Sequence, residues 1–282
     1  MYVRIGICLA LIGWMAGPAQ GLSEDRLVET TGQTRIDWRQ GIVAAVGTSI
    51  PSKKDFGKTA DRRLVLSAAR AAANRNLAEA VKSVRLSGEQ TIGQVTAGLP
   101  AVMDKIVAMI AGTETAKQEY LSDGTATVTV QMSLFKGLSQ LVLPQDIQQV
   151  EPIRPVADPA SDGKGAAATG TDVYSGLLVD ARGLDLAPAM VIHIQDESGQ
   201  AVYGPAFVSR ENAVQKGMCG YRRDMAAARN EARLGARPLI VKGLKILGGA
   251  DVVIGNADAA KLRGAGEHLS FLRQCRVVMV LE

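Results

Sequence analysis

The residues that could do chemistry gather in the C-terminal third of the chain, around the end of one apolar segment. Asp180 and Arg182 close the run 173–183, and a carboxylate and a guanidinium two residues apart can bind a polar ligand. The alternative is an ion pair that tethers a surface loop and contributes less than about 1 kcal/mol. The pair is therefore a candidate contact for a ligand or a partner, with a structural alternative.

Three more side chains complete this set of candidate contacts. His193 alternates with apolar residues in a predicted strand, which is typical of a structural histidine but leaves it beside a cleft near Asp180. Tyr174 and Tyr203 belong to a group of aromatic residues in this part of the chain. Aromatic side chains can anchor a partner, although packing in the core is the more common role.

No arrangement in the sequence points to catalysis or to a cofactor. Asp196 and Glu197 are adjacent, so on a strand they would point to opposite faces, which does not suit a glycosidase pair. The two histidines, His193 and His268, have no G-x-S-x-G motif nearby. Gly248-Gly249 lacks the lysine of a phosphate-binding loop and predicts a hairpin turn. We expect a protein that is not an enzyme and binds no cofactor.

The cysteines allow three interpretations. Cys8 lies within an N-terminal apolar segment, which leaves Cys219 and Cys275 in the rest of the chain. An even pair in an oxidising compartment predicts a disulfide, and two buried thiols are the alternative. With His268 they could supply three zinc ligands, but zinc sites usually show tighter paired spacings, so we expect no metal site.

Composition and charge describe a globular protein without a nucleic-acid-binding surface. The 282 residues are 47% hydrophobic and only 4% aromatic, so the core must be built from Ala, Val, Leu and Ile. The formal net charge is +4, and the basic residues are dispersed rather than gathered in a run. A nucleic-acid-binding protein would show a basic stripe or patch, so we expect no nucleic acid among the partners.

The N-terminus reads as an export signal covering residues 1–21. Arg4 supplies the positive charge, an apolar segment of about a dozen residues follows, and Ala19-Gln20-Gly21 places small residues at the cleavage positions. The apolar segment is shorter than the roughly 20 residues that span a bilayer. We therefore expect a periplasmic or secreted protein, with no transmembrane segment after cleavage.

Residues 22–150 predict a first domain in which helices pack on one face of a mostly antiparallel sheet. The clearest strand is 125–134, where apolar and polar residues alternate after the Asp123-Gly124 turn, so we expect a hairpin over 115–134. A polar lead-in over 22–34 and one strand over 35–47 precede it. Helices are expected over 60–84 and 99–111.

The helix over 60–84 has one apolar face that is rich in alanine. Small side chains let a helix approach a sheet closely, so we expect this face to pack on the strands. Asn74 and Asn76 are unusual within a helix. We expect a hydrogen bond from these residues to the loop near Gly47, with a solvated position for at least one of them as the alternative.

A Pro-, Gly- and Ala-rich linker over 151–172 separates the first domain from a second one over 173–282. The second domain alternates apolar runs with glycine turns and short helical segments. It includes an apolar closing strand over 276–281 and a helix that Asn256 is expected to cap. The predicted fold class is α+β, with two small domains that each carry helices on one face of a mostly antiparallel sheet.

Three motifs of the first domain are informative together. They are Arg35-x-x-Trp38-Arg-x-Gly41-x-Val-x-Ala45-x-Gly47, the Ala73-x-x-Asn76-Leu77-x-Glu79 helix end, and Asp123-Gly124 before an alternating strand. They give a resemblance, over about residues 35–140, to the FlgP-type family of small bacterial outer-membrane lipoproteins. It implies a non-enzymatic envelope protein, in some members a subunit of rings around the flagellar motor. The chain departs from the family in lacking a lipidated N-terminal cysteine. The second domain resembles uncharacterised exported proteins.

Together these features predict an exported, non-catalytic protein that works by protein–protein assembly in the cell envelope, peripheral to the outer membrane or around the flagellar motor. The expected partners are envelope or motor proteins and further copies of the chain. The alternative is a periplasmic binding module for a small polar ligand or a glycan, with its cleft near Asp180, Arg182 and His193.

Overall fold

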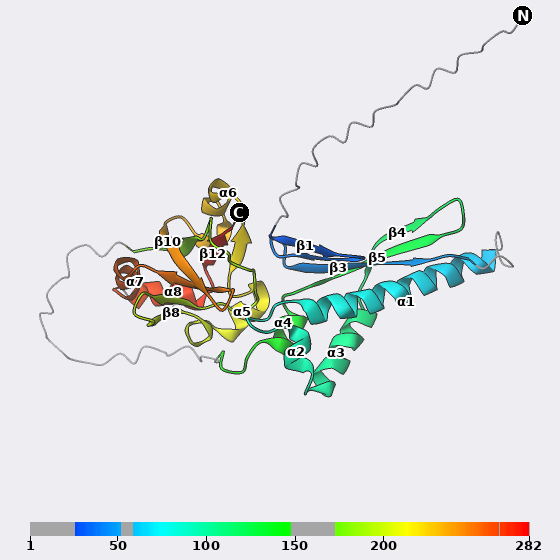
Figure 1. Cartoon of the computed structure of the whole chain (residues 1–282), viewed down its shortest axis with the longest axis horizontal. Helices are drawn as coiled ribbons and strands as arrows, with labels where there is room; N and C mark the ends of the chain where they lie inside the picture. The colour runs from blue at the N-terminus through cyan, green and yellow to red at the C-terminus, as the bar shows by residue number, and fades with distance from the viewer. Residues whose placement is uncertain (1–25, 52–58, 148–172, 265, 282) are drawn as a thin grey trace, which may run out of the picture.

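The computed structural model describes residues 26–51, 59–147, 173–264 and 266–281. The predicted signal (1–21) and the predicted linker (151–172) lie outside these ranges. The described residues form two α+β domains, each built around one sheet, as predicted. The first sheet extends away from the second domain (Figure 1).

The first domain contains five strands and four helices. In chain order these are β1 (Val28–Thr31), β2 (Thr34–Asp37), β3 (Ile42–Ser49), α1 (Thr59–Ser83), α2 (Ile92–Thr96), α3 (Pro100–Ala111), β4 (Thr115–Tyr120), β5 (Ala126–Ser133) and α4 (Gly137–Val142). The strand order is β1-β2-β3-β5-β4, and every pair is antiparallel. The predicted 115–134 hairpin is the β4–β5 pair, turned at Gly124 with φ +82°.

Helix α1 covers one face of this sheet at very short range. Ala69 and Ala73 are fully buried against β3. A Cβ added to Gly47 of β3 would lie 2.1 Å from the Ala73 nitrogen and 2.2 Å from the Ala69 carbonyl oxygen. Asn76 donates a hydrogen bond to the Val46 carbonyl at 2.7 Å, as predicted. The expected alanine face of the helix is therefore confirmed.

Two predictions for the first domain were wrong in detail. The segment 22–34 is not a plain lead-in, because β1 begins at Val28. Residues 35–47 form two strands joined by a turn, because the Asp37 carboxylate accepts backbone N–H bonds from Arg39 and Gln40 and Gly41 adopts φ +64°. The turn shifts the buried face of β3 to Val43 and Ala45, so Ile42 and Ala44 lie on the more open face.

The second domain has a seven-stranded sheet with helices on both faces. Its elements are β6 (Gly176–Asp180), β7 (Ile194–Asp196), β8 (Ala201–Tyr203), the 3₁₀ helix η1 (Pro205–Phe207), α5 (Arg210–Lys216), β9 (Gly220–Arg222), α6 (Met225–Arg229), the 3₁₀ helix η2 (Ala232–Leu234), β10 (Pro238–Leu247), β11 (Asp251–Ile254), α7 (Asn256–Arg263), α8 (Gly266–Arg273) and β12 (Val277–Val280). The strand order is β8-β7-β11-β10-β6-β12-β9.

This second sheet is mixed, not mostly antiparallel as expected. Strand β6 runs parallel to β10 and β12, β12 parallel to β9, and β11 parallel to β7. Both faces of β6 and β12 are buried: Leu178 and Val278 pack with α6 and η2, whereas Leu177 and Met279 join the core on the other side. Parallel strands covered on both faces need continuous apolar runs rather than alternation.

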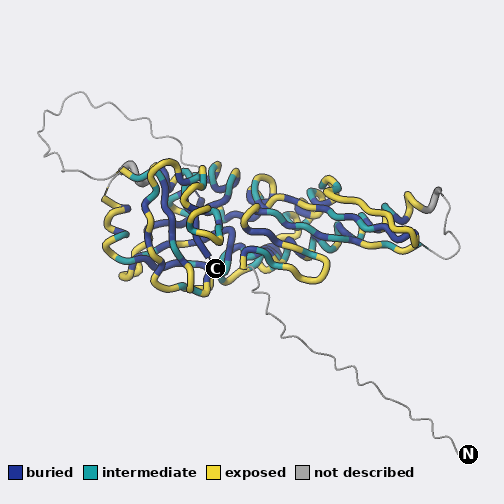
Figure 2. The backbone as a smooth tube through the Cα atoms, turned by 90° about the horizontal axis from the view of Figure 1, so that it is seen from above, coloured by how far each residue is buried: buried dark blue, intermediate teal, exposed yellow. Residues whose placement is uncertain are grey.

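The two domains share one hydrophobic core. A single buried cluster includes Val128 and Leu138 from the first domain and Leu177 and Val277 from the second. Figure 2 shows buried backbone passing from one domain into the other, while the far end of the first domain is mostly exposed. The domains are thus packed together as one body.

Candidate functional site

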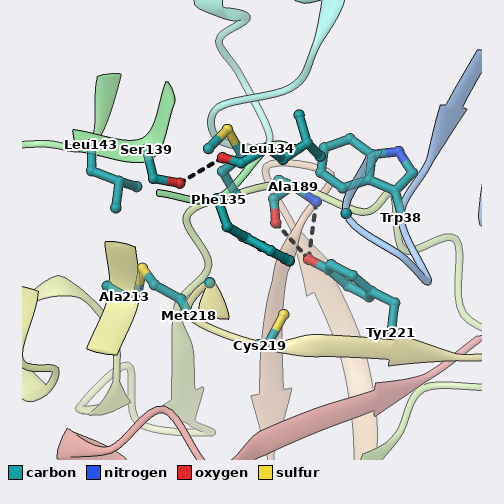
Figure 3. Close-up of a pocket in the computed structure, with 13 residues that line it drawn as sticks. Trp38, Leu134, Phe135, Ser139, Leu143, Ala189, Ala213, Met218, Cys219 and Tyr221 are labelled. Atoms are coloured by element: carbon teal, nitrogen blue, oxygen red, sulfur yellow. Dashed lines mark hydrogen bonds between the residues drawn. The ribbon is translucent and has the colours of Figure 1, made fainter. Parts of the chain in front are cut away.

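A small pocket lies where the two domains meet (Figure 3). It measures about 20 Å³, which is room for about one water molecule. Its walls are mostly apolar and come from both domains. They are formed by Trp38, Gly41, Leu134, Phe135, Ser139, Leu143, Ala189, Met190, Ala213, Gly217, Met218, Cys219 and Tyr221.

Phe135 of the first domain is the side chain around which this junction is packed. Figure 3 shows its ring pointing into the pocket toward Tyr221. A Cβ on Gly41 would lie 2.3 Å from one ring carbon, and a Cβ on Gly217 would lie 2.5 Å from another. Both glycines have positive φ, +64° and +75°. Because neither position has space for a side chain, a glycine from each domain holds the ring.

Polar groups around the pocket are bonded within the protein. The Tyr221 hydroxyl donates to the Ala189 carbonyl at 2.7 Å and accepts from the Ala189 N–H at 2.9 Å. The Ser139 hydroxyl donates to the Leu134 carbonyl at 2.6 Å. Burial raises the pKa of the Cys219 thiol to about 12, so it stays neutral and poorly nucleophilic. The arrangement suits packing between domains better than nucleophilic chemistry.

A polar cluster extends the junction on the β1 side. Arg85 donates to the Pro188 carbonyl of the second domain at 2.8 Å and pairs with Glu29. Its guanidinium also lies 5.7 Å from the Trp38 ring, and the Trp38 indole N–H donates to Glu29 at 2.5 Å. Trp38 in turn meets Tyr221 edge-on, with 6.1 Å between ring centroids. This cluster gives the junction a specific geometry.

On the opposite side of the junction, Arg210 of α5 is 93% buried and reaches across to the end of α4. It donates to the Pro144 carbonyl at 2.8 Å and to the Gln140 carbonyl at 3.1 Å. A cation at a helix C-terminus satisfies carbonyls that have no partner within the helix. The junction is therefore held by polar contacts at both ends and by Phe135 in the middle.

The structure brings Asp180 and Arg182 together but places His193 elsewhere on the sheet. Arg182 donates to Asp180 at 2.8 Å, and this hydrogen bond lowers the pKa of the Asp180 carboxyl. His193 is exposed before β7 and lies 3.2 Å from both carboxylate oxygens of Asp251, which raises the pKa of the imidazole. Strands β10 and β11 separate Asp180 from β7 in the sheet. The expected cleft between them is not formed.

The two predicted aromatic contacts differ in burial. Tyr203 is completely buried and donates to the Met218 carbonyl at 2.5 Å. Tyr174 is half-buried against the core. Asp196 and Glu197 also have structural roles. Asp196 accepts bonds from the Ser198 hydroxyl and from Arg263. Glu197 accepts the N–H of Asn256 at 3.0 Å.

Two smaller predictions concerned Asn256 and the cysteines. Asn256 is the first residue of α7 rather than its cap, and its side chain accepts the Glu197 N–H. Cys219 and Cys275 are both buried free thiols, which corresponds to the alternative and not to the disulfide. Gly220 pairs with Val278 in the parallel β9–β12 register, so Cys219 lies beside Val277, two residues from Cys275.

Sequence reasoning did not identify the residues of the junction. Gly41 and Gly217 stand in turns, Phe135 follows an obvious strand, and Arg85 and Arg210 read as ordinary surface cations. The available signal was the two glycines themselves, because a glycine can mark a close approach as well as a chain reversal. Among the described residues no group of His, Cys, Asp and Glu could hold a metal ion, and no helix has the length and apolarity to span a bilayer.

Comparison with known proteins gives a likeness for the second domain. Residues 176–282 match the family model described as the second domain of Treponema pallidum Tp0624. The matched range begins at the first residue of β6 and includes the whole seven-stranded sheet. No curated protein matches the chain. The second domain is thus similar to a domain of a spirochaete protein.

Proposed function

We propose that this chain is an exported, non-catalytic protein of the bacterial cell envelope that works by assembly with further copies of itself. The predicted signal over 1–21 supports export. The resemblance of residues 35–140 to the FlgP-type family supports an envelope role, at the outer membrane or around the flagellar motor. The observation that carries the proposal is an exposed apolar surface at one end of the first sheet.

This surface, called the tip here, is formed by Ile50, Leu64, Tyr120 and Leu121. Ser49 and Tyr120 both pair with Ala126, so the residues that follow β3 and β4 lie at the same end of the sheet. Ile50 is 76% exposed and Leu121 is 52% exposed. Figure 1 shows this end pointing away from the second domain.

Helix α1 contributes the rest of the tip. The Arg62 guanidinium lies 4.8 Å from the centre of the Tyr120 ring, which places the start of α1 beside the end of β4. Leu64, two residues further on, is 66% exposed in the same turn of the helix, on a different side of α1 from Arg62. Large apolar side chains gathered on a surface mark an interaction site more often than scattered ones do. Tyr and Arg are also common at the centres of protein interfaces.

The edge strand β4 is a less suitable contact than the tip. It carries Lys117 and Glu119 and has a register shift between Thr115 and Lys117. Charged residues and bulges on an edge strand discourage another strand from pairing with it. We therefore assign self-association to the side chains of the tip rather than to extension of the sheet.

The test compares two variants of the chain by light scattering coupled to size exclusion, over a concentration series. Leu121→Glu places a charge in the tip, and we expect it to lower the oligomer mass. Leu244→Glu is the matched control, because Leu244 is 46% exposed on β10 in the second domain. If both variants keep the wild-type mass at every concentration, the tip is not the assembly surface.

A separate experiment addresses the envelope part of the proposal. The chain is expressed in a bacterial host, and the mass of the accumulated protein and its cell fraction are measured. We expect the mass of residues 22–282 in the periplasmic or outer-membrane fraction. Full-length protein that stays in the cytoplasm would contradict export without bearing on the tip.

A further inference from the structure

Three basic side chains meet in the second domain, and none of them has an acidic partner among the described residues. They are Lys216 at the end of α5, Arg233 in η2 and Arg276 just before β12. Arg233 Nη2 donates to the Lys216 carbonyl oxygen. Arg276 Nη1 lies 3.6 Å from where a Cβ on Gly235 would be, directly beyond η2. Three separate segments thus bring their cations to one place.

The Arg233 guanidinium is the least satisfied group of this cluster. Its Nη1 atom is buried and has no hydrogen-bond partner among the described residues. It lies 3.7 Å from where a Cβ on Gly220 would be, so the side chain lies over the start of β9. A buried donor on a charged group is unfavourable when it is left unpaired.

The positive charge of the cluster is not neutralised by the described part of the chain. No carboxylate of the described residues lies within ion-pair distance of Lys216, Arg233 or Arg276. Burial lowers the pKa of the Lys216 ammonium, and the charges of Arg233 and Arg276 lower it further. The three cations are therefore close enough to repel one another.

The nearby Cys275 thiol does not supply the missing negative charge. Burial raises its pKa to about 11, even though Tyr203, Arg233 and Lys216 act in the opposite direction. The thiol is therefore neutral at physiological pH. Cys275 also has φ +53°, so its backbone holds an unfavourable conformation next to Arg276.

We propose that Lys216, Arg233 and Arg276 form a binding site for a small oxyanion, either free phosphate or the phosphate group of a larger molecule. Guanidinium groups offer paired N–H donors that match the oxygens of phosphate. Such an anion would accept the unpaired bond of Arg233 Nη1 and reduce the repulsion among the three cations. The site lies at the amino ends of β9 and β12.

The experiment measures the thermal unfolding midpoint with inorganic phosphate and with chloride at matched ionic strength. For the wild-type chain we expect a rise of about 2 to 4 °C at saturating phosphate. Lys216→Gln and Arg276→Gln should lose most of this rise. Arg229→Gln removes one exposed positive charge from α6 and should keep it.

The stability of Lys216→Gln in the two salts separates anion binding from a purely structural role. If the three cations repel one another and bind phosphate, Lys216→Gln is at least as stable as the wild-type chain in chloride and less stable than it in phosphate. Equal responses of all four proteins, no response of the wild-type chain, or a Lys216→Gln variant that is equally destabilised in both salts would overturn the proposal.

A second arm identifies the source of the phosphate by calorimetric titration with inorganic phosphate and with glycerol phosphate. Binding of both at one site per chain would indicate that the site takes a phosphate group on a larger molecule. Binding of inorganic phosphate alone would indicate the free anion. Binding of neither would contradict the site.

Discussion

The two sheets of this protein are stabilised in different ways. The five-stranded sheet is antiparallel and has α1 on one face, and in the described residues no helix covers its other face. The seven-stranded sheet is mixed, and its central strands β6 and β12 are buried on both faces. The second domain is therefore the more fully packed of the two. The sheet of the first domain extends from it and carries the tip at its far end.

The closest helix–sheet contact lies in the first domain, and breaking it should have the largest effect. Gly47→Ala places a methyl group against the backbone of α1, so the helix must move away from β3. We expect a loss of about 3 kcal/mol in the free energy of unfolding, measured by urea denaturation. Gly98→Ala is the control, because nothing lies within 4 Å of a Cβ at that position. A similar stability for both variants would mean that α1 is not packed so tightly.

The next largest effect concerns the junction between the domains. Phe135→Ala removes the ring held by Gly41 and Gly217, and we expect a loss of about 2 to 3 kcal/mol because the side chain is only partly buried. Calorimetry should then show two unfolding transitions where the wild-type chain shows one. Phe207→Ala, which removes another half-buried ring from within the second domain, should keep a single transition. Two transitions in the wild-type chain would contradict the shared core.

A smaller effect is expected from the hydrogen bond between helix α1 and strand β3 of the first sheet. Asn76→Ala removes the hydrogen bond to Val46, whereas Asn74→Ala removes an Oδ1 atom that has no partner among the described residues. Both changes improve helix propensity equally, so their difference combines the Asn76 hydrogen bond with the cost of the unpaired Asn74 Oδ1. We expect Asn76→Ala to be less stable than Asn74→Ala by about 1 kcal/mol, measured by urea denaturation. Equal stability of the two variants would mean that the hydrogen bond makes no net contribution to the free energy of unfolding.

The smallest effect on stability is expected from the His193–Asp251 pair on the surface of the second domain. Asp251 raises the pKa of His193 above its usual 6.5, so the protonated imidazole stabilises the folded chain. This contribution is fully present below pH 6.5 and is lost as the pH rises through the raised pKa. Because the pair is half exposed, we expect less than about 1 kcal/mol. His193→Gln should flatten the dependence of stability on pH in that window, and an unchanged pH profile would exclude the linkage.

The same comparison explains what could be predicted from the sequence. The alternation over 125–134 and the alanine face of 60–84 predicted β5 and α1, because each has one buried face. In β6 and β12 the runs Leu177–Val179 and Val277–Val280 have no alternation, and such runs indicate parallel strands buried on both sides. The turn at Asp37–Gly41 was missed because a side-chain bond to backbone N–H groups makes it, without a Pro-Gly or Asn-Gly pair.

The junction could not be predicted in the same way. It depends on which surfaces of two domains meet, and no local pattern relates Phe135 to Gly217 or Arg210 to Pro144. The cation cluster could not be predicted for the same reason. Lys216, Arg233 and Arg276 are separated in sequence and meet only through the β9–β12 register. The polar residues Asp180, Arg182 and His193 were predicted to contact a ligand or a partner. In the structure each of them forms a hydrogen bond within the protein.

The most direct test of assembly through the tip is amide hydrogen exchange at low and high protein concentration. The account predicts that protection increases with concentration in the backbone around Ile50 and Leu121, while the β10–β11 hairpin that carries Leu244 does not change. Protection that is independent of concentration at the tip, or that increases at the hairpin instead, would contradict the proposed assembly surface.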